Sequence, residues 1–246
     1  MMDAHYLALI PAYATATVLW FLINHFFKTP WSNVTKVNFE KPWMEFVLAL
    51  MATIAILVIG QLYMRDLLIP NQVNNNYIDA LNQIIIFSPA VILVLARRQS
   101  TATIWLPCTN ILPRIAIGSA LALCALFIYC LSREDSDGYF ELLSDIYQPG
   151  NISYLVQVFM EDITIALLFV RLSAWIGRRW SIVIVALLFA AGHIPALISV
   201  GATVAELGRL FIDTSIGVLI LSAVSKSRDI WWFFMVHFAL DMTQFQ

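Results

Sequence analysis

Long runs of apolar residues, separated by short polar connections, dominate the chain. A helix needs about 20 apolar residues to cross the hydrocarbon core of a bilayer, and it satisfies its own backbone hydrogen bonds. The runs are too long for strands and lack the alternating pattern of a membrane β-barrel. The pattern therefore predicts an all-α, polytopic membrane helix bundle of about eight spans, at residues 6–27, 43–64, 78–96, 114–132, 152–176, 181–199, 204–224 and 230–245.

The composition agrees with a membrane protein. Of the 246 residues, 61% are hydrophobic and 12% are charged, and the mean hydropathy is +0.80. A typical soluble domain is about 45–50% apolar and about 25% charged. The connections contain no linker or repeat, so we expect one integral membrane domain over residues 1–246, surrounded by membrane lipids. A net charge of −2 without a dense Lys/Arg run predicts no nucleic-acid partner.

Basic residues gather in alternate connections. They are Lys28, Lys36, Lys41, Arg97, Arg98, Arg114, Arg178, Arg179, Lys226 and Arg228. Cytoplasmic connections of membrane proteins carry an excess of Lys and Arg, so we expect this side to be cytoplasmic and both termini to lie outside. The segment before the first apolar run lacks the basic start of a cleavable signal, and this run is expected to be a retained span.

Ionisable residues inside the predicted spans are concentrated in the second half of the chain. Such residues are costly in hydrocarbon, and by default each marks a functional site or a buried pair. They are Glu161, Asp162, His193, Glu206, Arg209, Asp213, His237 and Asp241. The first four predicted helices carry almost none in their interiors. We therefore expect the site within the last four helices.

Three of these residues have a helical spacing that suits hydrolysis. Phe189 and His193 are four residues apart, as are His237 and Asp241, so each pair shares one helix face. Three helices can then direct Glu161, His193 and His237 into one cavity. There, a carboxylate can remove a proton from water while imidazole N–H groups stabilise an oxyanion.

Structural roles are the alternative for each residue. Glu161 could form a buried pair with Arg209, which itself could form a local ion pair with Asp213. His193, two residues before Pro195, could mark a helix kink. His237 and Asp241 could bond each other. The spacing alone does not decide between these roles and catalysis.

The second half of the chain resembles the CPBP family of intramembrane proteases, which includes the CAAX prenyl endopeptidases and the bacteriocin-processing, Abi-like immunity relatives. The family motifs are Glu-Glu-x-x-x-Arg, Phe-x-x-x-His and His-x-x-x-Asn/Asp. The corresponding residues here are Glu161-Asp162, Phe189 to His193, and His237 to Asp241. The resemblance covers roughly residues 155 to 245, and it divides the chain into variable N-terminal helices (1–150) and core helices (151–246).

The resemblance implies a metal-independent, glutamate-dependent endopeptidase in a bacterial inner membrane, without a cofactor. Glu161 and Asp162 would form the acidic pair with Glu161 as general base, His193 would help to activate water, and His237 with Asp241 would stabilise the oxyanion. The substrate would be a membrane-associated peptide or protein tail. A set of Glu, His and Asp side chains would also suit a zinc or iron ion by ligand type, and chelators would distinguish the two.

The first motif departs from the family pattern. Ala166 occupies the Arg position, and Arg171 lies about 15 Å farther along the helix than Glu161. We hypothesise that Arg209 supplies the missing cation from another helix. Asp213 stands where the family tends to have Gly. The degenerate motif leaves open a catalytically inactive relative that acts as a membrane scaffold or immunity protein, and the intramembrane carboxylates leave open a small transporter.

Overall fold

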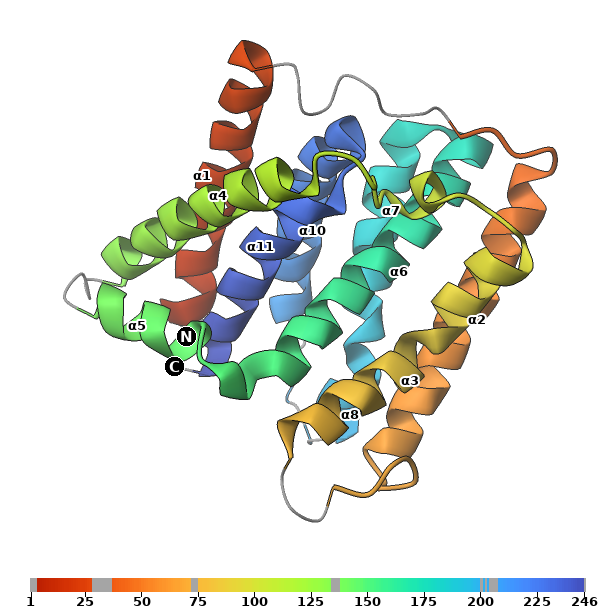
Figure 1. Cartoon of the computed structure of the whole chain (residues 1–246), viewed down its shortest axis with the longest axis horizontal. Coiled ribbons are helices and arrows are strands. Elements are labelled where there is room, and N and C mark those ends of the chain that lie inside the picture. Colours follow the sequence, from red (N-terminus) through yellow and green to blue (C-terminus); the bar gives the residue numbers. More distant parts are fainter. Residues whose placement is uncertain are drawn as a thin grey trace.

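The computed structural model describes residues 4–27, 37–71, 75–133, 138–199, 201, 203 and 208–245. All regular structure in these residues is helical, as the sequence predicts, and the long helices lie side by side (Figure 1). The α-helices are α1 (Ala4–Phe26), α2 (Pro42–Tyr63), α3 (Asn76–Ala96), α4 (Ile111–Ser132), α5 (Tyr139–Ile146), α6 (Ile152–Ile176), α7 (Arg178–Gly192), α8 (Ile194–Ser199), α10 (Arg209–Ser227) and α11 (Ile230–Asp241). Short 3₁₀ turns are η2 (Thr101–Ile104), η3 (Pro149–Asn151) and η4 (Met242–Phe245).

Five of the described helices are long and apolar enough to cross a membrane, so the predicted count of eight spans is not supported. They are His5–Phe26, Pro42–Tyr63, Asn76–Ala96, Ile111–Ser132 and Leu210–Ser227. Every predicted segment contains a helix, but the 25-residue α6 is not among the five, and α7 and α11 have only 15 and 12 residues. The apolar run of α7 continues into α8, and that of α11 continues into η4. Each run is long enough in the sequence to cross a bilayer, but the structure divides it between two elements.

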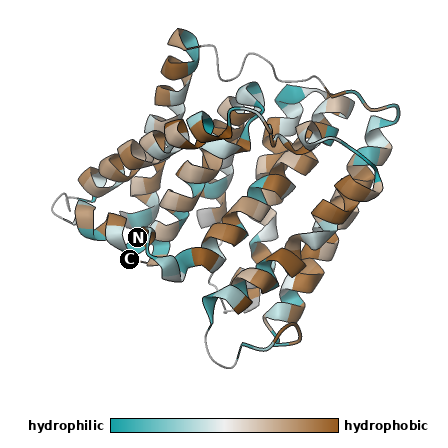
Figure 2. Cartoon of the chain, viewed as in Figure 1, coloured by the Kyte–Doolittle hydropathy of each residue, from teal (hydrophilic) through white to brown (hydrophobic). Residues whose placement is uncertain are grey.

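Apolar side chains cover much of the outer surface of the bundle. On α2, only 11% of the most apolar stretch of 18 residues is buried, and Val47, Met51, Ile54 and Val58 are exposed. Figure 2 shows brown, hydrophobic ribbon on the outer helices as well as inside the bundle. A continuous apolar exterior is what a lipid environment requires, because apolar surface exposed to water is costly. The fold is that of an integral membrane protein.

One break in the helices falls at a predicted site residue. Helix α7 ends at Gly192, His193 is its C-terminal cap, and α8 begins at Ile194, one residue before Pro195. Proline cannot donate a backbone hydrogen bond, and its ring clashes with the carbonyl group four residues earlier, here that of Ala191, which explains the break. The kink that the sequence predicts near His193 is therefore present.

Polar contacts join the helices where α2, α4 and α11 begin and α3 ends. Arg97 binds Glu45 at 2.6 Å, and Arg114 binds Asp229 at 2.6 Å. Asp229 also accepts a hydrogen bond from the Trp231 backbone N–H at 3.0 Å, and so caps α11. Both carboxylates are buried, so these ion pairs fix how α2, α3, α4 and α11 meet.

Candidate active site

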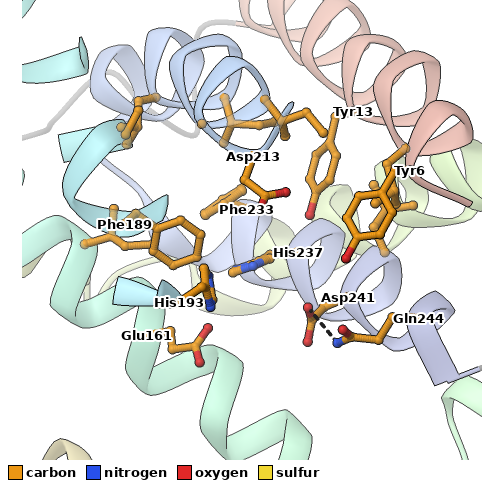
Figure 3. A pocket seen from close by; sticks show the side chains of 18 of the residues that line it. Tyr6, Tyr13, Glu161, Phe189, His193, Asp213, Phe233, His237, Asp241 and Gln244 are labelled. Carbon is orange, nitrogen blue, oxygen red and sulfur yellow. Dashed lines mark hydrogen bonds between the residues drawn. The ribbon is translucent and has the colours of Figure 1, made fainter. Parts of the chain in front are cut away.

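A cavity of about 280 Å³ lies between α1, α6, α7, α10 and α11. Its polar and aromatic lining includes most of the site residues that the sequence predicts, and Figure 3 shows their side chains pointing into it. These lining residues are His5, Tyr6, Tyr13, Glu161, Phe189, His193, Asp213, Phe233, His237, Asp241 and Gln244. The predicted convergence of Glu161, His193 and His237 on one cavity is thus what the structure has.

The two acidic residues of α6 have different surroundings. Glu161 lines the cavity, and its Oε1 accepts a hydrogen bond from Gln157 Nε2 at 2.9 Å, one turn earlier. Asp162 is 1% exposed and is not a lining residue. Successive residues of a helix point about 100° apart, because a turn has about 3.6 residues. Only Glu161 can therefore meet a molecule in the cavity directly.

Asp162 instead binds the imidazole of His237. Its Oδ1 lies 2.8 Å from His237 Nδ1, and both residues are buried. A carboxylate can only accept, so the hydrogen bond places a proton on Nδ1. Asp162 Oδ2 has no hydrogen-bond partner among the described residues. Asp162 therefore fixes the orientation of His237 and leaves Nε2 as the ring nitrogen available to a ligand.

Aromatic rings also hold the two imidazoles. Phe233 stacks on His237, with ring centroids 5.2 Å apart and planes at 14°. Phe189 meets His193 edge to face at 4.9 Å and lies 6.2 Å from His237. The i and i+4 spacing of Phe189 and His193 on α7 brings this pair together. Phe189 is thus a supporting wall of the cavity, as the sequence suggests.

Asp241 lies one turn beyond His237 on α11 and also faces the cavity. Its Oδ1 accepts a hydrogen bond from Gln244 Nε2 at 3.1 Å. The sequence left open a hydrogen bond between His237 and Asp241. In the structure His237 Nδ1 bonds Asp162 instead. Asp241 stands beside the imidazole without being its hydrogen-bond partner.

Residues 150–243 match the family described as type II CAAX prenyl endopeptidase Rce1-like. The match supports the assignment of this second half of the chain to the CPBP/CAAX protease family. The match covers the three predicted motifs and nearly the range expected from the resemblance. No curated protein and no solved structure matches the chain.

The CAAX protease motif on α6 lacks its Arg, and the structure shows what occupies the space. Ala166 is fully buried in the core. Arg171 donates to the Thr103 and Leu167 carbonyl oxygens at 3.2 and 3.0 Å and lies 3.8 Å from Glu45. It belongs to the opposite end of the bundle, in agreement with the prediction that it is too far away to substitute. The Arg209 side chain and Glu206 lie outside the part of the chain that the structure describes.

Helix α1 is the part of the site that the sequence missed. Tyr6, Leu9 and Tyr13 line the cavity from this helix, outside the CAAX protease match. Their spacing of three and four residues places them on one helix face, and this spacing is the feature of the sequence that could have indicated a shared wall. The sequence directs the site to the last four predicted helices, and the cavity extends beyond them to α1.

Side chains that could bind a metal ion line the cavity, but the described ones are not clustered around a common point. Among the described residues, no three His, Cys, Asp or Glu side chains are placed to hold a metal ion together. The donor types that line the cavity would suit zinc, but the placement of the described side chains does not fit a shared ion.

Proposed function

We propose that this chain is an intramembrane endopeptidase in which Glu161 is the general base. The observation that supports this proposal is the convergence of Glu161, His193 and His237 on one cavity inside an apolar helix bundle. The family match supports the same class of reaction. The substrate class that fits is a membrane-associated peptide or protein tail, because such a chain can reach a cavity set among membrane-spanning helices.

Hydrolysis would begin with water held between Glu161 and His193. Glu161 accepts one proton as the water oxygen attacks the scissile carbonyl carbon, and the carbonyl electron pair moves onto oxygen to form an oxyanion. His237 Nε2–H donates to this oxyanion. When the intermediate collapses, the C–N bond breaks, and the leaving amine takes the proton held by Glu161. One carboxylic acid and one amine result, and the enzyme returns to its starting state.

Asp162 acts through His237 as a positioning residue. Protonated His237 would donate from Nδ1 to Asp162 and from Nε2 to the oxyanion, and the buried carboxylate would compensate the imidazolium charge. In this arrangement His237 places a positive charge beside the acidic pair. Asp241, also beside the ring, would favour the same charged form.

The predicted orientation is part of the proposal. The start of α1 and the end of the chain lie at the same end of the bundle (Figure 1), and His5 and Gln244 both line the cavity. With both termini outside a bacterial inner membrane, the cavity would open toward that side. Reactivity of single cysteines introduced at Leu7 and Gln244 with a membrane-impermeant thiol reagent, in a variant without native cysteines, tests this orientation.

The decisive experiment compares wild-type protein with Glu161→Gln. Both are purified, placed in lipid nanodiscs and incubated with a membrane proteome, and new peptide termini are identified by mass spectrometry. We expect cleavage by the wild type that disappears in Glu161→Gln, because an amide cannot accept the proton from water. Activity should survive zinc chelators.

Glu141→Gln is the matched control, because Glu141 is exposed on α5 and does not line the cavity. It should cleave like the wild type. Cleavage products shared by the wild type and Glu161→Gln would contradict the proposal. A cellular phenotype that persists in both Glu161→Ala and His193→Ala would indicate a binding protein instead.

A further inference from the structure

Among the residues given a role in the proposed reaction, His237 alone donates a hydrogen bond to the oxyanion, and hydrolysis benefits from a second donor. Asp241 occupies the motif position where the family can have Asn. An Asn amide donates hydrogen bonds, whereas an ionised carboxylate only accepts them. Asp241 already accepts from Gln244, and its negative charge would repel an oxyanion placed beside it. The partner of His237 in stabilising the oxyanion is therefore to be sought elsewhere in the cavity lining.

Tyr13 on α1 has the required position. Its side chain is 7% exposed, and it lines the cavity across from α11. Figure 3 shows its hydroxyl directed into the cavity, toward the side where Asp213 and His237 lie. Helix α1 packs against α10 and α11, which brings this hydroxyl close to the site although Tyr13 and His237 are far apart in sequence.

The Tyr13 hydroxyl is available to a ligand. Within the described residues, it forms no hydrogen bond with a side chain or with the backbone, and it is not among the polar atoms sealed from solvent. A buried tyrosine hydroxyl usually has a partner, so one that opens into a cavity is suited to water or substrate. A phenol keeps its proton at neutral pH and can donate it in a hydrogen bond.

We propose that Tyr13 is a catalytic residue that, together with His237, donates a hydrogen bond to the oxyanion of the tetrahedral intermediate. This inference rests on the proposed endopeptidase function. The hydroxyl keeps its proton throughout: it donates as negative charge develops on the carbonyl oxygen and is released when the C–N bond breaks. Helix α1 would then complete a site whose other groups lie on α6, α7 and α11.

Tyr13→Phe tests the proposal, because it removes the hydroxyl and keeps the ring that fills the wall. Loss of one oxyanion donor lowers kcat about 100-fold, and KM for a cleaved peptide should change less than about twofold, because the donor acts mainly in the transition state. Tyr77→Phe is the matched control. Tyr77 is 72% exposed on α3, outside the cavity, and its substitution should leave kcat and KM unchanged.

A second variant separates a catalytic role from a packing role. Asp241→Asn, added to Tyr13→Phe, replaces a carboxylate by an amide that can donate, and it should recover at least about tenfold of the lost kcat. A packing defect caused by Tyr13→Phe would not be repaired in this way. Thermal unfolding of each variant in nanodiscs checks that the bundle is intact.

The outcomes distinguish this inference from the proposed function. If the wild type cleaves, Glu161→Gln does not, and Tyr13→Phe retains full kcat, the role of Tyr13 is wrong while the endopeptidase stands. A rise in KM at unchanged kcat would also overturn it, since Tyr13 would then bind the uncleaved peptide. Without Glu161-dependent cleavage in the wild type, both proposals fail.

Discussion

Gly118 lies in close contact with α11, the helix that carries His237, and replacing it should disturb the site. A Cβ atom at this position would lie 2.7 Å from Trp232 Cα and 2.8 Å from Trp232 O. Ordinary contact begins at 3.4 Å, so to reach it Gly118→Ala requires the two backbones to move apart by about 0.7 Å, the difference between 3.4 and 2.7 Å. The obstructing atoms are backbone, which cannot rotate away.

This movement would act on the pair formed by Asp162 and His237. If α11 shifts by about 0.7 Å relative to α6, the distance between His237 Nδ1 and Asp162 Oδ1 increases from 2.8 Å to about 3.5 Å, beyond a normal hydrogen bond. Overpacking of this kind costs about 1–3 kcal/mol. A misplacement near 1 Å can lower the rate about 100-fold. We expect Gly118→Ala to lower both the unfolding temperature and kcat.

The assay measures thermal unfolding and peptide cleavage in nanodiscs for Gly118→Ala and for Gly60→Ala. At Gly60 the nearest atom to an added Cβ is Ile86 Cγ2 at 3.9 Å, so no displacement is needed. The control should resemble the wild type in both measurements. Equal unfolding temperatures and rates for the two variants would refute the inference that the close contact at Gly118 positions α11.

Two further predictions concern the charges around the site. Asp162→Ala should lower kcat at least about 100-fold with little change in KM, because His237 loses the carboxylate that orients it; wild-type kinetics would contradict this role. Arg209→Ala should lower activity, because we expect that side chain to supply the missing motif cation. Arg171→Met should lower the unfolding temperature but preserve kcat per folded molecule, because Arg171 bonds Gln99 and Thr103 away from the cavity. An active Arg209→Ala protein with wild-type stability would exclude Arg209 from the site.

The positions of the helices could be predicted from the sequence because apolar runs of bilayer length have few other uses. The number of spans could not, because the run that begins near residue 181 is divided at His193 into α7 and α8. Residues around Pro195 contain the signal for this break, but hydropathy alone does not show that both pieces are short. Local backbone chemistry here overrides the apolar pattern.

The site was predictable where one helix determines the spacing. The Phe189 and His193 pair follows from residues four apart. The bond between Asp162 and His237 was not predictable, because it joins residues 75 positions apart and depends on how α6 and α11 are rotated against each other. The same holds for Tyr13, whose inward direction is set by the packing of α1 against α10 and α11.

The origin of the cavity walls has a consequence for how such a protein can change its targets. The carboxylate and imidazoles lie within residues 150–243, which match a known family, whereas one wall comes from Tyr6, Leu9 and Tyr13 of α1. Substitutions at Tyr6 and Leu9 would alter the shape presented to an incoming chain without touching Glu161 or its neighbours. Under the proposed function, Tyr6 and Leu9 affect selectivity while the catalytic role of α1 rests on Tyr13, so a first helix exchanged at every position except Tyr13 offers a direct route to redirecting cleavage.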